Sequence, residues 1–103
     1  MIFSRRKLLA SKRAVPESFA EQADIAHRNL IAELASAGAG AEHVVKLNTY
    51  VVDLDKERSK AVSKAKSQYF NLPNQPASTM VGVSALVMPE LLVEVEATAV
   101  MDE

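Results

Sequence analysis

The stretch Leu91-Leu-Val-Glu-Val-Glu-Ala-Thr-Ala-Val-Met101 carries the clearest structural signal in the chain. In a strand, successive side chains point to opposite faces of the sheet, so alternate residues share a face. One face would hold Val93, Val95, Ala97 and Ala99, and the other Leu92, Glu94, Glu96 and Thr98. The stretch therefore predicts a strand over 91–101 with one apolar face and one largely polar face.

A second strand is expected directly before it. Residues 78–86 read Ser-Thr-Met-Val-Gly-Val-Ser-Ala-Leu, and only residues 87–90 separate them from the last strand. A link this short predicts an antiparallel hairpin. Gly82 lies in mid-strand, where a glycine marks a bulge or a close approach of another part of the chain.

Two helices and a further strand precede these elements. Residues 18–37 are expected to form a helix, because apolar residues recur at steps of three and four, Ser18 and Glu21 have capping-box spacing, and Gly38 can end it. Residues 43–53 are rich in β-branched residues and predict a strand. After Asp53 and Asp55 as caps, residues 56–70 predict a surface helix with a thin apolar stripe.

The order of elements predicts an α+β fold. It reads (β)-α-β-α-β-β, where the bracketed strand would contain Ile2-Phe3 and Leu8-Leu9. Such an order favours a single mixed sheet with both helices on one face. The other face would be exposed in a monomer, and small domains commonly bury such a face in an oligomer. The 103 residues suit one domain over 1–103.

Composition limits the classes of function. The net charge of -1 gives no general case for a nucleic acid or membrane partner, although residues 1–16 carry five basic side chains and no acid. The absence of cysteine excludes disulfides and thiolate chemistry and is compatible with the cytoplasm. Ser4-Arg5-Arg6-Lys7 looks like a twin-arginine signal but lacks the apolar stretch that should follow.

Several segments in sequence order resemble the RidA/YjgF family, also labelled endoribonuclease L-PSP. They are Phe19-Ala-Glu-Gln22, Val44-Val-Lys46, Tyr50-Val-Val-Asp-Leu54, Pro76-Ala-Ser-Thr-Met-Val-Gly-Val83 and Leu92-Val-Glu-Val-Glu-Ala97. The resemblance covers roughly residues 17–101, preceded by the basic segment 1–16, which is expected to be flexible or a partial strand. It implies a chorismate-mutase-like fold and a homotrimer that binds a small molecule in clefts between subunits.

The resemblance also implies an activity. The best-known family reaction hydrolyses imines and enamines, such as 2-iminobutanoate and 2-iminopropanoate, to ketoacids and ammonia without a cofactor or metal. An arginine grips the substrate carboxylate, and a glutamate of the last strand, here Glu94, helps to position water.

The sequence departs from the family pattern in three places. Ser78, followed by Thr79, stands where active members have arginine, and losing hydrogen bonds to a charged group weakens binding by about one to two decades. The family's Ser-Gly-Gln falls on Ser4-Arg5-Arg6, and its first strand and tyrosine are expected to be missing. Arg5 or Arg6 could replace the lost guanidinium, but a frayed basic tail is the favoured alternative.

Each candidate residue also has an ordinary structural explanation. Glu94 could be a solvated strand carboxylate, and Ser78 and Thr79 could be strand hydroxyls. His27 and His43 lie 16 positions apart, which suits neither a metal site nor a catalytic triad.

Three functions stay open: a RidA-like deaminase, a non-catalytic ligand-binding trimer of the same fold and, less favoured, a ribonuclease or nucleic-acid binder.

Overall fold

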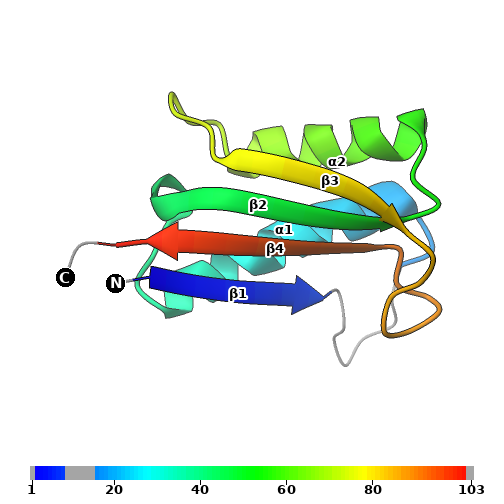
Figure 1. Ribbon diagram of the computed structural model, residues 1–103, viewed down its shortest axis with the longest axis horizontal. Coiled ribbons are helices and arrows are strands. Elements are labelled where there is room, and N and C mark those ends of the chain that lie inside the picture. The colour runs from blue at the N-terminus through cyan, green and yellow to red at the C-terminus, as the bar shows by residue number, and fades with distance from the viewer. Residues whose placement is uncertain (1, 9–15, 102–103) are drawn as a thin grey trace.

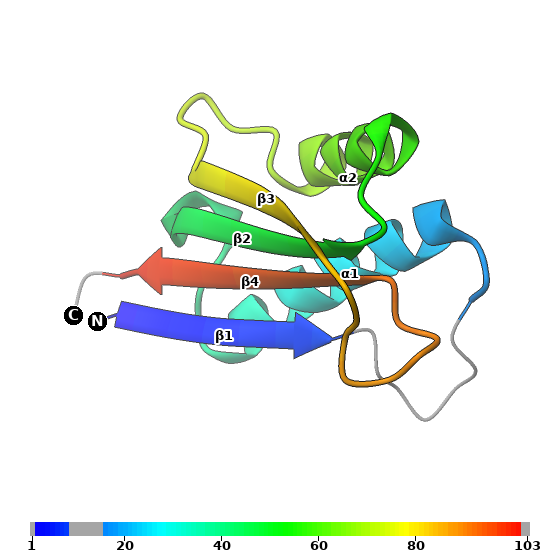
Figure 2. The same cartoon turned by 45° about the vertical axis from the view of Figure 1, so that its right-hand side comes forward.

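The computed structural model describes residues 2–8 and 16–101, with side chains over 16–101. One mixed sheet has the strand order β1-β4-β2-β3. The strands are β1 (Ile2–Leu8), β2 (Val44–Val52), β3 (Ala77–Val83) and β4 (Val93–Val100). The helices α1 (Phe19–Ser36) and α2 (Lys56–Tyr69) both lie behind the sheet in Figure 1 and stay on that side in Figure 2. The predicted α+β fold with two helices on one face is confirmed.

Both ends of α1 follow the predicted signals. Ser18 is the N-cap, and its side chain accepts a hydrogen bond from the backbone N–H of Glu21 at 3.3 Å. At the other end Gly38 adopts φ +81°, a left-handed conformation that glycine adopts without a steric penalty. The N–H of Ala39 then donates to the carbonyl of Leu34 at 2.9 Å, which completes a Schellman motif.

The start of α2 corrects one capping prediction. Asp55 is the N-cap and accepts from the backbone N–H of Arg58 at 2.8 Å. Asp53 does not cap the helix, because it lies in the preceding turn with φ +50°. The Arg58 guanidinium donates to the carbonyl of Val52 and lies 5.0 Å from the centre of the Phe19 ring, so it ties the end of β2 to both helices.

The hydrophobic core lies between the helices and one face of the sheet. The apolar alternation of the last strand is confirmed, because Val93, Val95, Ala97 and Ala99 are fully buried. They pack in one cluster with buried residues of β2, α1 and the segment after α2: Leu47, Val51, Leu30, Leu34 and Phe70. We call the opposite side of the sheet, which neither α1 nor α2 covers, the open face.

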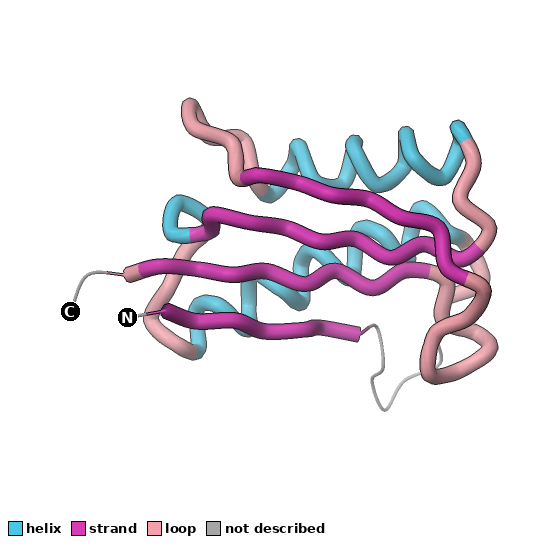
Figure 3. Tube along the Cα trace, viewed as in Figure 1, coloured by secondary structure: helices cyan, strands magenta, loops and turns pink. Residues whose placement is uncertain are grey.

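The predicted hairpin between the last two strands is wrong. β3 pairs with β2 in parallel, whereas β4 pairs antiparallel with both β1 and β2. The connection of β2 to β3 through α2 is a strand–helix–strand unit, which returns the chain in the same direction. Because β2 lies between β3 and β4, residues 84–92 form a loop that passes the end of β2 (Figure 3).

Gly82 marks a close approach within the chain. A Cβ atom at Gly82 would lie 3.2 Å from Cβ of Leu54. β3 keeps an unbroken register with β2, so there is no bulge at this glycine. The one register shift in the described sheet lies between Val44 and Lys46, where β2 pairs with β4.

The amino-terminal basic segment contributes a strand. Ile2–Leu8 form β1 and pair with β4, so this part is not a frayed tail. Residues 9–15 lie outside the described part of the chain. Within residues 16–101, neither helix has the combination of length and apolar character that a membrane span requires.

Candidate functional site

The strand registers place the candidate residues on shared rungs across the sheet. One rung runs from Arg6 through Glu96 and Asn48 to Thr79. Two positions along the strands, another rung runs from Leu8 through Glu94 and Tyr50 to Val81. Glu94 and Glu96 alternate with the core residues of β4, so both carboxylates lie on the open face.

Glu94 is the most buried of the three predicted site residues whose side chains are described, the others being Ser78 and Thr79. Its exposed fraction is only 6%, although it lies on the side of the sheet that the helices leave uncovered. Carboxylates are almost never buried unless they are paired or hydrogen-bonded. The burial of Glu94 does not agree with the alternative explanation of a solvated strand carboxylate.

Glu96, which was not among the predicted site residues, forms a polar network beside Glu94. Its Oε1 accepts hydrogen bonds from Nδ2 of Asn48 at 3.1 Å and from the hydroxyl of Tyr50 at 3.2 Å. Both donors come from β2, on the open face. The alternation of β4 placed Glu96 beside Glu94, but only the register between β2 and β4 identifies its two donors.

Ser78 and Thr79 lie on β3, at the edge of the sheet, and both are exposed. Thr79 is in register with Asn48 and therefore shares the open face with Glu94 and Glu96. Ser78 is in register with the core residue Leu47, so it belongs to the side that carries the helices. One chain thus does not bring Ser78 and Glu94 to the same face of its sheet.

Arg5 and Arg6 lie on the opposite edge strand, β1. Arg5 shares a rung with Ser78, but two strands lie between them. Three strand spacings separate their backbones by about 14 Å. Within one chain, Arg5 and Ser78 therefore lie on the two opposite edges of the sheet.

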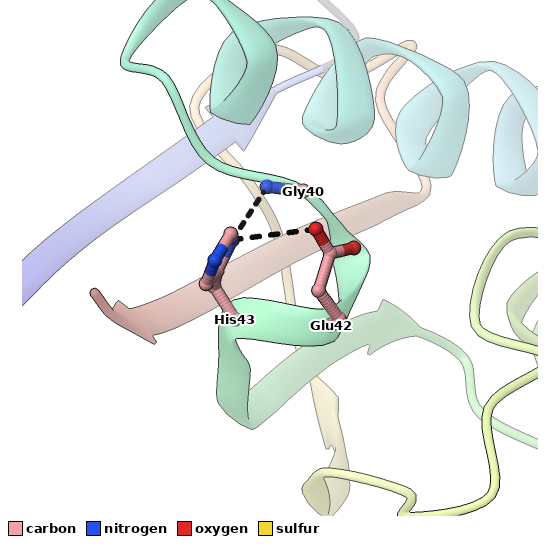
Figure 4. A network of polar contacts seen from close by, with 3 residues as sticks. All are labelled: Gly40, Glu42 and His43. Atoms are coloured by element: carbon pink, nitrogen blue, oxygen red, sulfur yellow. Dashed lines mark hydrogen bonds and ion pairs between the residues drawn. The ribbon is translucent and has the colours of Figure 1, made fainter. Parts of the chain in front are cut away.

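The two histidines lie apart from these residues and serve local structure. Nδ1 of His43 accepts from the backbone N–H of Gly40 at 2.9 Å and lies 3.6 Å from Oε1 of Glu42, as Figure 4 shows. His27 is buried in α1, and its Nδ1 donates to the carbonyl of Ala23 at 2.7 Å. Over the part of the chain with described side chains, no three His, Asp or Glu residues are grouped as metal ligands would be.

A hollow in residues 16–101 lies elsewhere. It has a volume of about 480 Å³ and lies between the helices, where Ile25, Ala61 and Ala65 are among the lining residues. Neither Glu94 nor Thr79 lines it. The hollow is therefore separate from the part of the open face that carries Glu94 and Thr79.

The fold and the open-face carboxylates define a small α+β protein of the chorismate-mutase-like type. Residues 8–101 match the family described as Endoribonuclease L-PSP, and the chain belongs to this family, which is the RidA/YjgF family. Curated proteins give no match.

Solved structures agree with this assignment. A Rid family protein of unknown function, YyfB from Yersinia pestis, is 28% identical with a TM-score of 0.87, over 97% of this chain and 78% of that one. Rv2704 from Mycobacterium tuberculosis, of the YjgF/YER057c/UK114 family, is 33% identical with a TM-score of 0.75, over 93% and 79%. Escherichia coli TdcF, solved with bound serine, shares the fold at 19% identity and a TM-score of 0.86, over 98% and 81%.

Proposed function

We propose that this chain forms a homotrimer that acts on a small molecule in the clefts between subunits, and that Glu94 positions water there to hydrolyse reactive imines or enamines. The observation that carries the proposal is the burial of Glu94 on the open face, at 6% exposure. Family membership supports a small-molecule role for this face.

The proposed reaction converts an imine and water into a ketoacid and ammonia. As water adds to the imine carbon, the carboxylate of Glu94 accepts a proton from the water and passes it to the nitrogen, which gives a carbinolamine. When the carbon–nitrogen bond then breaks, the same carboxylate transfers the proton of the new hydroxyl group to the nitrogen, which leaves as ammonia. Every atom of the products comes from the imine and one water molecule, so this chemistry calls for no cofactor or metal.

The trimer is proposed from the surface that one chain leaves open. Val45, Val81 and Val100 are 48%, 41% and 45% exposed, and each lies on one of the strands β2, β3 and β4. Exposed apolar side chains on a sheet without a covering layer favour burial against another subunit. Contact between copies would also allow Ser78 or Thr79 of one chain to approach Glu94 of another.

A non-catalytic ligand-binding trimer is the second candidate, and the serine at position 78 favours it. A serine hydroxyl offers one neutral hydrogen bond, whereas an arginine offers a bidentate, charge-assisted pair. The proposed carboxylate grip is therefore weaker in this chain, unless Arg5 or Arg6 of a neighbouring copy supplies it.

A ribonuclease or nucleic-acid role is the weakest candidate. The family description names an endoribonuclease, but the net charge of this chain is -1. Nucleic-acid binding depends mainly on basic side chains that neutralise phosphates, and it weakens steeply with salt. Gel shifts at several salt concentrations would detect such binding.

A cytoplasmic location fits the proposed substrates, which arise as metabolic intermediates.

The experiment generates 2-iminobutanoate in situ and follows the release of 2-oxobutanoate by the full chain, whose mass in solution is measured by light scattering. We expect a molecular mass of three times 11.2 kDa. We also expect 2-oxobutanoate release above background, and Glu94→Gln should lower its rate at least tenfold. Glu90→Gln, at an exposed loop position, is the matched control. Full release by Glu94→Gln, or a monomer, would contradict the proposal; background release with 2-oxobutanoate binding would select the non-catalytic trimer.

A further inference from the structure

Gln22 of α1 is a fully enclosed polar side chain, with 1% exposure. Its Nε2 donates to the carbonyls of Pro16 at 2.8 Å and Glu90 at 3.0 Å. Its Oε1 accepts from the backbone N–H of Leu92 at 2.9 Å. One side chain thus connects the entry to α1 with a loop that lies about 70 positions away in the sequence.

That loop, residues 84–92, leads from β3 to β4 at one end of the sheet (Figure 3). In its outer part, the side chain of Val87 is 72% exposed. Its inner end is held by the buried side chain of Leu91 and by the hydrogen bond from Val52 N–H to Leu92 at 3.0 Å, in addition to Gln22. The start of β4 is therefore held by these contacts together with the pairing of Val93 with Val51 and of Glu94 with Tyr50.

Leu92 lies two residues before Glu94 in an extended segment, so the two side chains point to the same side. A change in the position or register of Leu92 would move Glu94 with it, because register errors displace every following side chain. A glutamine is suited to this place, since its amide both donates to the carbonyl of Glu90 and accepts from the N–H of Leu92.

We infer that Gln22 is a positioning residue for Glu94: by holding Glu90 and Leu92, it fixes the start of β4 and with it the placement of the Glu94 carboxylate. The catalytic importance of this positioning rests on the proposed function. The positioning itself can be measured without catalysis, because it changes the environment of one carboxylate.

The test uses the full chain with Gln22→Met, which keeps a side chain of similar size but removes all three hydrogen bonds. NMR follows amide hydrogen exchange at Leu92 and the titration of the Glu94 side-chain carboxyl. We expect exchange at Leu92 to accelerate by about tenfold or more and the Glu94 titration midpoint to move, while the amide of Val62 in α2 keeps its protection. Tyr69→Phe, which removes one hydrogen bond between the helices, is the control and should leave Leu92 and Glu94 unchanged.

An unchanged Glu94 titration in folded Gln22→Met would overturn the inference. A measurement on the unaltered protein covers the case in which this variant does not fold: the side-chain amide protons of Gln22 should exchange far more slowly than those of the exposed Gln68. Equal exchange rates would also overturn it. Failure of the proposed function is seen separately, as full imine hydrolysis by Glu94→Gln.

Discussion

Asn48 and Glu96 face each other across β2 and β4, and Nδ2 of Asn48 donates to Oε1 of Glu96 at 3.1 Å. The hydroxyl of Tyr50 donates to the same oxygen, so two neutral donors hold a partly buried carboxylate beside Glu94. The open face therefore presents a carboxylate held in place next to the proposed water-positioning residue.

The first prediction concerns this network. Tyr50→Phe removes only the hydroxyl and should lower the free energy of unfolding by about 1–2 kcal/mol, because hydrogen bonds to charged groups are stronger than neutral ones. Urea denaturation measures the change. In a double-mutant cycle with Glu96→Gln, the two losses should not add. Strict additivity would show that the hydroxyl does not stabilise the protein through Glu96.

The second prediction restores the missing guanidinium. Ser78→Arg should tighten binding of 2-oxobutanoate about ten- to hundredfold, since a bidentate arginine–carboxylate pair replaces one neutral hydrogen bond. Titration calorimetry measures the affinity. Thr79→Arg adds the same charge one residue away, on the other face of β3, and should give a much smaller gain. Equal gains from both variants would point to general charge attraction instead of a defined site.

The third prediction concerns acid stability. Burial lowers the pKa of His27, against a smaller opposing effect of its hydrogen bond to Ala23, and the nearby charges are Asp24 on α1 and Lys66 on α2. The ring also stacks on Tyr69, with centroids 6.4 Å apart. Its Nε2 has no hydrogen-bond partner among the described residues, so protonation would place an uncompensated charge between the helices.

The direction of the change in stability with pH follows from the lowered pKa of His27. The unfolded chain takes up the proton first, near pH 6.5, so the stabilising effect of neutral His27 is complete above that pH and is lost as pH falls toward the folded-state pKa. In this window His27 should contribute a slope of at most about 1.4 kcal/mol per pH unit. Urea denaturation from pH 7.5 to 5 should show a shallower slope for His27→Gln than for the control His43→Gln. The same slope in both variants would contradict the prediction.

The fourth prediction concerns the end of α1. Gly38→Ala should lower the free energy of unfolding by about 1 kcal/mol, because a Cβ atom disfavours the left-handed conformation at φ +81°. There is open space around the added atom, so the loss would come from the backbone and not from a clash. Gly38→Asn should lose less, since asparagine tolerates this conformation better. A larger loss for Asn than for Ala, measured by thermal or urea denaturation, would rule this explanation out.

Local patterns predicted the elements because their causes lie within a few residues. The cap at Ser18, the glycine at position 38 and the alternation of Val93 and Val95 each reflect a local requirement of helix or strand geometry. The hairpin prediction failed because strand pairing is not local: the strand–helix–strand path places β3 beside β2 and leaves β4 to pair on the other side of β2. The same path leaves the loop of residues 84–92 to cross the end of β2.

The sequence by itself determined the α+β class, the helix boundaries, the family and Glu94 as a candidate. Hydrophobic periodicity, capping residues and family motifs each depend on residues that are close together in the sequence. Only the tertiary structure decided which residues accompany Glu94. It brought Asn48 and Tyr50 to Glu96, placed Ser78 on the other side of the sheet, and joined Gln22 to Leu92. Register and long-range hydrogen bonds are set by how all the elements pack together, and that packing is a property of the whole chain.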